Sequence, residues 1–233
     1  MLFKLSGLRM IPKIIHFCWF GRGKKSELIE RCMRSWKRYL PDYEFMEWNE
    51  DSFDISQNRY VAQAYEQKKW AFVTDYVRLW AIEKFGGIYL DTDVEVFQSL
   101  DEFLVHSGFT GFELYNGKLA PITAVIAAEN GHPIILDLLS DYESKLFIGD
   151  DGELDLATNV ELIKKKFFHD YGVINNNKHQ VIDGGFHIYP DFYFCNKSNK
   201  RSYTMHHFGG SWLSPRKRLK TKLARALFKL IGG

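Results

Sequence analysis

Two aspartates near the middle of the chain, Asp91 and Asp93, directly follow a short apolar segment at residues 88–90. Because alternate side chains of a β-strand point to the same side, we expect both carboxylates to emerge on one face at the end of a strand. Such a carboxylate pair suits Mn²⁺ or Mg²⁺, which proteins often bind together with the phosphates of a substrate. Two solvated aspartates at a strand end are the alternative for an isolated Asp-x-Asp pattern.

The surrounding sequence favours the metal site. Residues 72–85 predict a mostly buried helix, a Gly-Gly pair ends it, and residues 88–90 form an apolar strand that leads to Asp91. In an α/β sheet, ligands bind outside the carboxyl ends of the strands. Asp75 and Arg78 are three residues apart, so they share one face of this helix among apolar neighbours. They are candidate catalytic residues near the metal, or else a structural ion pair.

The whole chain predicts a single α/β domain without internal repeats or linkers. Its opening predicts a right-handed β-α-β unit, and the full pattern predicts a mixed, mostly parallel sheet with helices on both faces. The expected strands lie at residues 13–20, 43–48, 88–90, 109–113 and 123–128 and near Ile188 and Tyr203. The expected helices lie at residues 26–39, with Ser26 as cap, and at residues 60–68, 72–85, 133–145 and 159–168.

Composition and charge argue against several classes of protein. The net charge of +2 gives no global field that would attract nucleic acid. Three cysteines, Cys18, Cys32 and Cys195, form an odd set without C-x-x-C spacing, so we expect reduced thiols. No apolar run reaches the length of a membrane span and the N-terminal residues carry no cleavage signal, so we expect a cytoplasmic location.

Three segments of the sequence resemble a known enzyme family. They are IPKIIHFCWFG at residues 11–21, AFVTDYVRLWAIEKFGGIYLDTDV at residues 71–94 and HHFGGSW at residues 206–212. Together they resemble the bacterial glycosyltransferases of family 32, capsule and O-antigen sugar transferases related to Och1-like yeast mannosyltransferases and, more distantly, to glucosylating clostridial toxins. The central segment is the most specific, because it combines the DxD with an upstream Asp-x-x-Arg and the intervening GGIYL.

This resemblance implies a GT-A type domain over residues 1–213 that carries out metal-dependent, retaining sugar transfer. The implied donor is a nucleotide-sugar, with a UDP-hexose or UDP-HexNAc favoured, and the implied cofactor is Mn²⁺ or Mg²⁺. The implied acceptor is a growing surface polysaccharide, lipid-linked.

The resemblance also assigns a role to each matching residue. It implies that Asp93 binds the metal directly, and that Asp91 contacts the ribose and reaches the metal directly or through water. Asp75 and Arg78 match the family's pair beside the donor sugar, where Asp75 could accept sugar hydroxyls and Arg78 could hold this carboxylate or a phosphate. Trp19, at the end of the first strand, would stack on the donor's base, unless it is an ordinary core tryptophan.

The HHFGGSW segment resembles the family's C-terminal lid over the diphosphate. It would contribute Ser211 and Trp212 to donor binding and a histidine as a metal ligand. We expect His207 rather than His206 in this role, because His207 lies five residues before Trp212, as the corresponding ligand does in the toxin relatives.

One departure from the family pattern concerns Asn159. Family members often have a Gly-Pro turn just before the helix that begins here, whereas this chain reads Ala157-Thr158-Asn159. Asn159 could replace that turn, contact the donor sugar or cap the helix, and capping is the expectation.

Residues 214–233 contain many lysines and arginines and no acid, with leucines and alanines at helical spacing. This pattern predicts a basic amphipathic helix that lies on an anionic membrane surface, at the inner face of the cell membrane. The alternative is a helix that packs on the domain or serves in oligomerisation.

Two other functions remain as alternatives to the transferase. A glycoside hydrolase needs two acids that flank a glycosidic bond, usually on rigid strands, but the candidates Asp150, Asp151 and Glu153 lie in a polar loop. A non-catalytic nucleotide-sugar or polysaccharide binder would not need the complete set of candidate catalytic residues described above.

Overall fold

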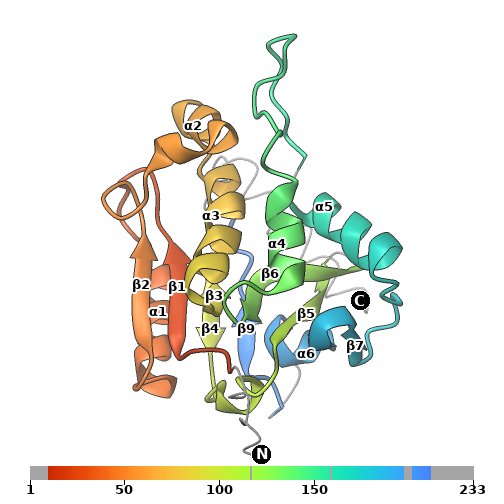
Figure 1. Cartoon of the computed structure of the whole chain (residues 1–233). Helices are drawn as coiled ribbons and strands as arrows, with labels where there is room; N and C mark the ends of the chain where they lie inside the picture. Colours follow the sequence, from red (N-terminus) through yellow and green to blue (C-terminus); the bar gives the residue numbers. More distant parts are fainter. Residues whose placement is uncertain (1–9, 116, 158, 197–200, 211–233) are drawn as a thin grey trace, which may run out of the picture.

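The computed structural model describes residues 10–115, 117–157, 159–196 and 201–210. A seven-stranded mixed sheet with the strand order β2-β1-β3-β6-β5-β8-β7 forms its centre, and β4 pairs with β9 in a separate two-stranded ribbon (Figure 1). The strands of the sheet are β1 (Ile14–Cys18), β2 (Glu44–Trp48), β3 (Gly87–Leu90), β5 (Gly108–Tyr115), β6 (Lys118–Ala128), β7 (Gln180–Ile182) and β8 (Phe186–Tyr189). The α-helices are α1 (Glu27–Tyr39), α2 (Arg59–Glu66), α3 (Trp70–Phe85), α4 (Pro133–Ser140), α5 (Asn159–Lys165) and α6 (Asp191–Phe194).

The opening β1-α1-β2 unit confirms the sequence-based prediction. Ser26 caps α1, because its hydroxyl accepts a hydrogen bond from the backbone N–H of Ile29. The apolar face of α1 buries Cys32 and Trp36, and β1 pairs in parallel with β2 from Ile14↔Glu44 to Cys18↔Trp48. A helical crossover therefore joins two parallel strands, as expected.

Helix α3 is buried over most of its length and leads into β3 through two glycines. The backbone N–H of Gly86 donates to the carbonyl of Ile82, and both Gly86 and Gly87 have positive φ angles. A Cβ atom at Gly87 would lie 2.8 Å from the carbonyl oxygen of Ile14, so only glycine allows β3 to lie this close to β1. Because β1 and β3 are parallel neighbours, the residues that follow them meet at one edge of the sheet.

The second half of the sheet is less parallel than expected. The pairs β1–β2, β1–β3 and β5–β8 are parallel, whereas β3–β6, β5–β6 and β7–β8 are antiparallel. The short connection between β5 and β6 closes a hairpin, which makes these two strands antiparallel. Helix α4 is also shorter than predicted and ends at Ser140.

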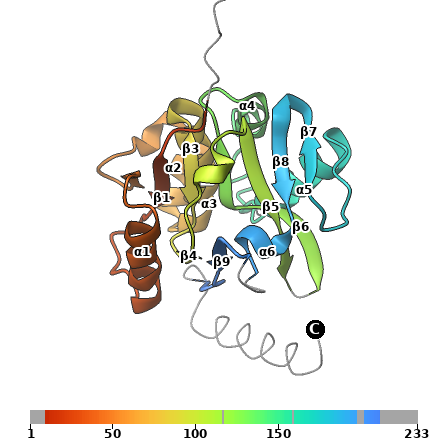
Figure 2. The ribbon, with the colours of Figure 1, turned by 90° about the horizontal axis from the view of Figure 1, so that it is seen from below.

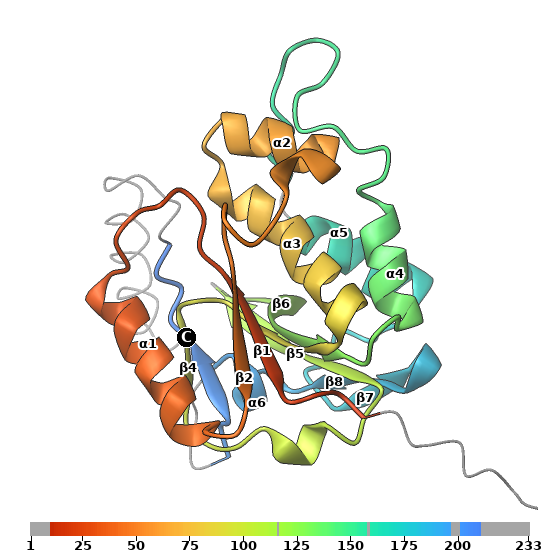
Figure 3. The ribbon, with the colours of Figure 1, turned by 60° about the vertical axis from the view of Figure 1, so that its left-hand side comes forward.

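Helices cover both faces of the sheet, which confirms the expected layering. Helices α2, α3, α4 and α5 pack on one face, whereas α1, α6 and the β4–β9 ribbon pack on the other (Figure 3). Each face has its own apolar core, and large fully buried side chains such as Trp36, Tyr60, Phe109 and Phe186 fill the two cores. Cys18, Cys32 and Cys195 are free and buried, in agreement with the prediction of reduced thiols.

The ribbon of β4 (Val94–Val96) and β9 (Thr204–His206) connects distant parts of the chain. Its antiparallel register runs from Val94↔His206 to Val96↔Thr204, and it lies beside α6 in the view from below (Figure 2). The ribbon therefore brings the C-terminal histidines next to the aspartates that precede β4.

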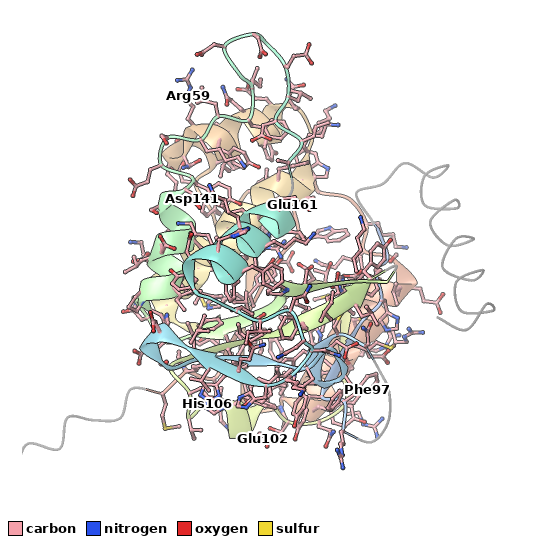
Figure 4. The ribbon with its side chains drawn as sticks, turned by 90° about the vertical axis from the view of Figure 1, so that its right-hand side faces the viewer. Arg59, Phe97, Glu102, His106, Asp141 and Glu161 are labelled. Atoms are coloured by element: carbon pink, nitrogen blue, oxygen red, sulfur yellow. The ribbon has the colours of Figure 1, made fainter. Side chains whose placement is uncertain are left out.

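The connection between α4 and α5 projects beyond α2. In Figure 4 it lies at the end of the molecule where Arg59 is labelled, whereas Glu102 and His106 lie at the opposite end. It is anchored where the backbone N–H of Phe147 donates to the side-chain carbonyl of Gln63 at 2.9 Å. Within the described ranges, no helix has both the length and the apolar character that crossing a membrane requires.

Candidate active site

The two aspartates of the DxD lie on a turn, which corrects the strand geometry assumed from the sequence. Strand β3 ends at Leu90, and the backbone N–H of Val94 donates to the carbonyl of Asp91 at 2.9 Å to close the turn before β4. The carboxylates still converge, but around a histidine from β9. The Nε2 atom of His206 lies 3.3 Å from Oδ1 of Asp93 and 4.0 Å from Oδ2 of Asp91.

The identity of this histidine is a second correction. The expected ligand, His207, instead turns its Nε2 toward Glu95 at 2.8 Å. Successive side chains along an extended segment point to opposite sides, so only one of the two histidines can face the DxD turn. Ligand atoms of Asp91, Asp93 and His206 lie within 4.8 Å of one another and form a possible metal site.

The charges around His206 fit a cation site. Burial by itself raises the pKa of Asp93, but the adjacent His206 and the backbone N–H of Gly209, which donates at 2.6 Å, lower this pKa to about 2. Burial by itself lowers the pKa of His206, but Asp93 and Glu113 raise it well above its usual value. The negative charge that favours a proton on His206 would also favour a divalent cation at this position. Mn²⁺ or Mg²⁺ suits the oxygen ligands, and an imidazole that has lost one proton suits Mn²⁺ as a nitrogen ligand.

Asp75 and Arg78 of α3 extend the site into the protein interior. They form a buried ion pair in which Nη2 of Arg78 lies 3.1 Å from Oδ1 of Asp75. The same guanidinium reaches the DxD, because its Nη1 lies 3.4 Å from Oδ1 of Asp91. Burial raises the pKa of Asp75 to about 6 even though the positive charge of Arg78 opposes this shift. The pair is thus continuous with the DxD turn.

Three further side chains hold this arrangement in place. Tyr89 donates its hydroxyl to Oδ1 of Asp91 at 2.9 Å, and its ring lies under Arg78 at 4.7 Å. Thr123 accepts hydrogen bonds at Oγ1 from Arg78 and from the side-chain amide of Asn159, each at 2.9 Å. Each polar group that faces the buried guanidinium therefore has a partner, which limits the movement of Arg78.

Asn159 does not act as the predicted helix cap. Helix α5 begins at Asn159 itself, whose side-chain amide is turned toward Thr123. Its backbone N–H points at Oδ2 of Asp75, at 3.4 Å. The buried Asn159 therefore belongs to the surroundings of the Asp75–Arg78 pair.

Trp19 follows β1 and is only half-buried, so it is not an ordinary core tryptophan. It lines a surface cavity of about 410 Å³ together with Arg22, Lys25 and Glu50, among others. Its indole N–H donates to the carbonyl of Gly23 at 2.6 Å, which fixes the orientation of the ring. Because β1 and β3 are parallel neighbours, this cavity opens at the same edge of the sheet as the DxD turn.

The remaining predicted residues lie elsewhere or outside the described ranges. Ser211, Trp212 and the basic segment 214–233 are not among the described residues. Asp150, Asp151 and Glu153, the candidates for a hydrolase, are exposed in the projecting connection between α4 and α5. They do not flank the DxD turn.

Several residues of the site were missed by sequence reasoning. Glu113 lies 3.0 Å from Nδ1 of His206, and Tyr89, Thr123 and Gly209 contact the residues described above. Tyr89 lies in the GGIYL segment and Gly209 lies in the HHFGGSW segment, so the resemblance of these segments to the family could have pointed to both residues. Glu113 and Thr123 come from strands β5 and β6, where nothing in the local sequence distinguishes them.

Known proteins resemble this chain in the segment around the DxD turn. Residues 26–110 match the family described as "Glycosyltransferase sugar-binding region containing DXD motif". The chain is 29% identical over 136 residues to inositol phosphoceramide mannosyltransferase 3 of Schizosaccharomyces pombe, a match that covers 55% of this chain and 36% of the relative. The chain therefore spans about a third of the length of this curated relative.

Two solved structures share the fold. A glycosyltransferase called PaToxG matches with a TM-score of 0.52 and 21% identity, covering 70% of each chain. A glycosyltransferase involved in the glycosylation of the major capsid of PBCV-1 matches with a TM-score of 0.50 and 14% identity, covering 92% of this chain and all of the other. The fold is that of a GT-A glycosyltransferase. The segment that matches the family model includes α1, the Asp75–Arg78 pair and the DxD turn.

Proposed function

We propose that this protein is a metal-dependent, retaining glycosyltransferase that uses a nucleotide-sugar donor. One observation carries the proposal: Asp91, Asp93 and His206 converge on a possible cation site that is joined through Arg78 to the buried Asp75. A structural ion pair would not need to continue into a cluster of metal-ligating groups. The likeness in fold and in the DXD segment to glycosyltransferases supports this reading.

The chain's own residues suggest how the donor is held. Asp91, Asp93 and His206 would hold Mn²⁺ or Mg²⁺, which supplies charge neutralisation at the leaving diphosphate. Arg78 forms ion pairs with the carboxylates of both Asp75 and Asp91, and it thereby holds the two carboxylates in fixed orientations. Above about pH 6, Asp75 is ionised and can accept hydrogen bonds from the hydroxyls of the donor sugar.

The cavity beside Trp19 suits the donor's base. An aromatic ring on which a base stacks contributes about 1–3 kcal/mol, and the partly exposed indole offers such a face. Lys25 lies 5.6 Å from the centre of this ring and forms an ion pair with Glu47, another residue of the cavity wall, at 2.9 Å. We favour UDP as the nucleotide, with a hexose or HexNAc as the sugar, and retention of the anomeric configuration.

The acceptor we propose is a lipid-linked, growing surface polysaccharide such as a capsule or O-antigen chain. The name of the fungal relative describes mannose transfer to inositol phosphoceramide, a lipid, and this supports an acceptor at a membrane surface. The basic composition of residues 214–233 supports the same location, at the inner face of the cell membrane.

A panel of UDP- and GDP-sugars with Mn²⁺ tests the proposal, with GDP-mannose included because of the fungal relative's name. Nucleotide release and thermal stabilisation are measured for each donor. A donor at a hundredfold excess over its Kd should stabilise the fold by about 2.7 kcal/mol. Stabilisation without turnover on any acceptor would favour the non-catalytic binder, and metal-independent cleavage of a finished glycan would favour the hydrolase. For a retaining enzyme, NMR of the product should show the donor's anomeric configuration.

A further inference from the structure

Glu113 links the proposed cation site to a buried thiol. Its Oε2 atom accepts a hydrogen bond from Sγ of Cys195 at 3.3 Å and lies 3.0 Å from Nδ1 of His206. The three donor atoms lie within 4.8 Å of one another. The other nitrogen of the same imidazole, Nε2, faces Asp93 at 3.3 Å. His206 therefore stands between two different sets of metal-ligating groups.

The spacing of the second set is close to that of zinc ligands. Zn²⁺ binds sulfur at about 2.3 Å and nitrogen or oxygen at about 2.0–2.2 Å. A tetrahedral ion would then hold a sulfur and an oxygen about 3.6 Å apart, and an oxygen and a nitrogen about 3.4 Å apart. The observed separations are 3.3 Å between Cys195 and Glu113 and 3.0 Å between Glu113 and His206. Small shifts of the side chains would make room for the ion.

We propose that Glu113, Cys195 and Nδ1 of His206 form a second metal site, which takes a thiophilic divalent cation such as Zn²⁺. A thiolate ligand favours Zn²⁺, whereas the two carboxylates on the other side of the ring favour Mn²⁺ or Mg²⁺. Partly exposed side chains provide the entrance, because Glu113 and His206 retain 16% and 14% exposure. Cys195 closes the inner end of the site and is fully buried.

The two metal sites exclude each other because they share one imidazole. Its Nε2 faces Asp93 and its Nδ1 faces Glu113. A neutral imidazole has a lone pair on only one of its two nitrogens, so a cation bound at Nδ1 leaves no lone pair on Nε2 for a second cation. Binding of Zn²⁺ as a thiolate complex releases the thiol proton of Cys195 to solvent, with no change in oxidation state.

Zinc should therefore act as an antagonist of the DxD metal. The consequence for catalysis depends on the function proposed above, whereas the zinc site itself does not. Both can be tested on the full chain.

Co²⁺ in place of Zn²⁺ tests the site directly, on the protein alone. A cobalt–thiolate bond gives a charge-transfer absorption in the near ultraviolet, which we expect for the wild type and for Cys32→Ser, since Cys32 is a buried thiol outside the donor group. Cys195→Ser should lose this band. If Cys195→Ser does not fold, Glu113→Gln takes its place and should weaken Co²⁺ binding at least about tenfold. An absent band, or an equal band in Cys195→Ser, would overturn the proposal.

Competition for Mn²⁺ tests the shared histidine. Free Mn²⁺ is measured by electron paramagnetic resonance while Zn²⁺ is added. Zinc at about ten times its Kd should raise the apparent Kd for Mn²⁺ about tenfold in the wild type. When two ligands exclude each other, the apparent Kd of one is multiplied by one plus the ratio of the other's concentration to its Kd. The same zinc concentration should change it less than about twofold in Cys195→Ser. Equal competition in the two proteins would place zinc at the DxD instead and defeat the proposal. Both experiments measure metal binding alone, so they test the zinc site even if the protein does not transfer sugar.

Discussion

Nε2 of His206 lies 3.3 Å from Oδ1 of Asp93, whereas its neighbour His207 turns its own Nε2 toward Glu95 at 2.8 Å. The two histidines follow each other along an extended segment, so they face opposite sides of the β4–β9 ribbon. The ribbon thus delivers one imidazole to the DxD turn and directs the other to α1, where Arg31 also pairs with Glu95 at 3.6 Å.

This arrangement predicts different effects for the two histidines. His206→Ala should weaken Mn²⁺ binding by about tenfold or more, because it removes a metal ligand. His207→Ala is the matched control and should change the affinity less than about twofold. Isothermal titration with Mn²⁺ measures both. A larger loss in His207→Ala would restore the ligand expected from the sequence.

Asp93 should be essential for metal-dependent binding of the donor. Asp93→Ala removes the carboxylate that faces His206 and the N–H of Gly209, and it should abolish Mn²⁺-dependent binding of UDP and sugar transfer. The variant should still unfold cooperatively, since the turn is closed by backbone atoms of Asp91 and Val94. Asp150→Asn, in the projecting connection, is a control that should keep full activity. Near-normal turnover of Asp93→Ala with Mn²⁺ would contradict this role.

Asp75 should make the protein less stable as the pH rises. Its pKa is raised from 3.8 to about 6 in the folded state, so the folded state holds this proton more tightly than the unfolded state. Ionisation of Asp75 should therefore subtract from stability between about pH 4 and pH 6, and the difference between the wild type and Asp75→Asn isolates this contribution. Asp75→Asn cannot ionise, and we expect it to be about 1–3 kcal/mol more stable than the wild type at pH 7.5 and equally stable at pH 4.

Denaturant unfolding across this pH range, with parallel assays of sugar transfer, measures the effect of Asp75→Asn. The variant should lose activity while it gains stability, as expected for a charge kept in the interior for function. A variant that is less stable than the wild type at pH 7.5 would show that the carboxylate is mainly a structural partner of Arg78.

Trp19 should contribute to the affinity for the nucleotide. Trp19→Ala should weaken UDP binding by about tenfold or more, in line with about 1–3 kcal/mol for base stacking. Trp19→Phe keeps an aromatic face and should retain most of the affinity. Titration of UDP in the presence of Mn²⁺ measures both variants. Unchanged affinity in a folded Trp19→Ala protein would show that the base does not bind in this cavity.

The basic C-terminal segment should determine membrane association. Truncation after Ser214 should preserve hydrolysis of the donor, because the described site lies within residues 19–209, but it should abolish sedimentation with anionic vesicles. Neutral vesicles serve as the control for charge. Activity on a lipid-linked acceptor should fall together with vesicle binding. Equal sedimentation of the full-length and truncated proteins would show that this segment has another role.

The sequence alone determined the local elements and the chemistry of the central motif. Ser26 predicts the start of α1, and the Gly-Gly pair predicts the end of α3. Both predictions succeed because each residue acts on the backbone of the adjacent helical turn. The DxD and the Asp75–Arg78 pair were recognised for the same reason, since their partners lie within a few residues of one another or on one helix face.

Only the tertiary structure decided which residues complete the site. The choice of His206 over His207 depends on the register of the β4–β9 ribbon, and a shift of one residue would exchange the two side chains. Glu113 and Thr123 enter through the β5–β6 hairpin, which also makes the sheet less parallel than expected. Strand register and hairpin pairing arise from contacts between segments far apart in the chain, and local sequence signals do not encode them.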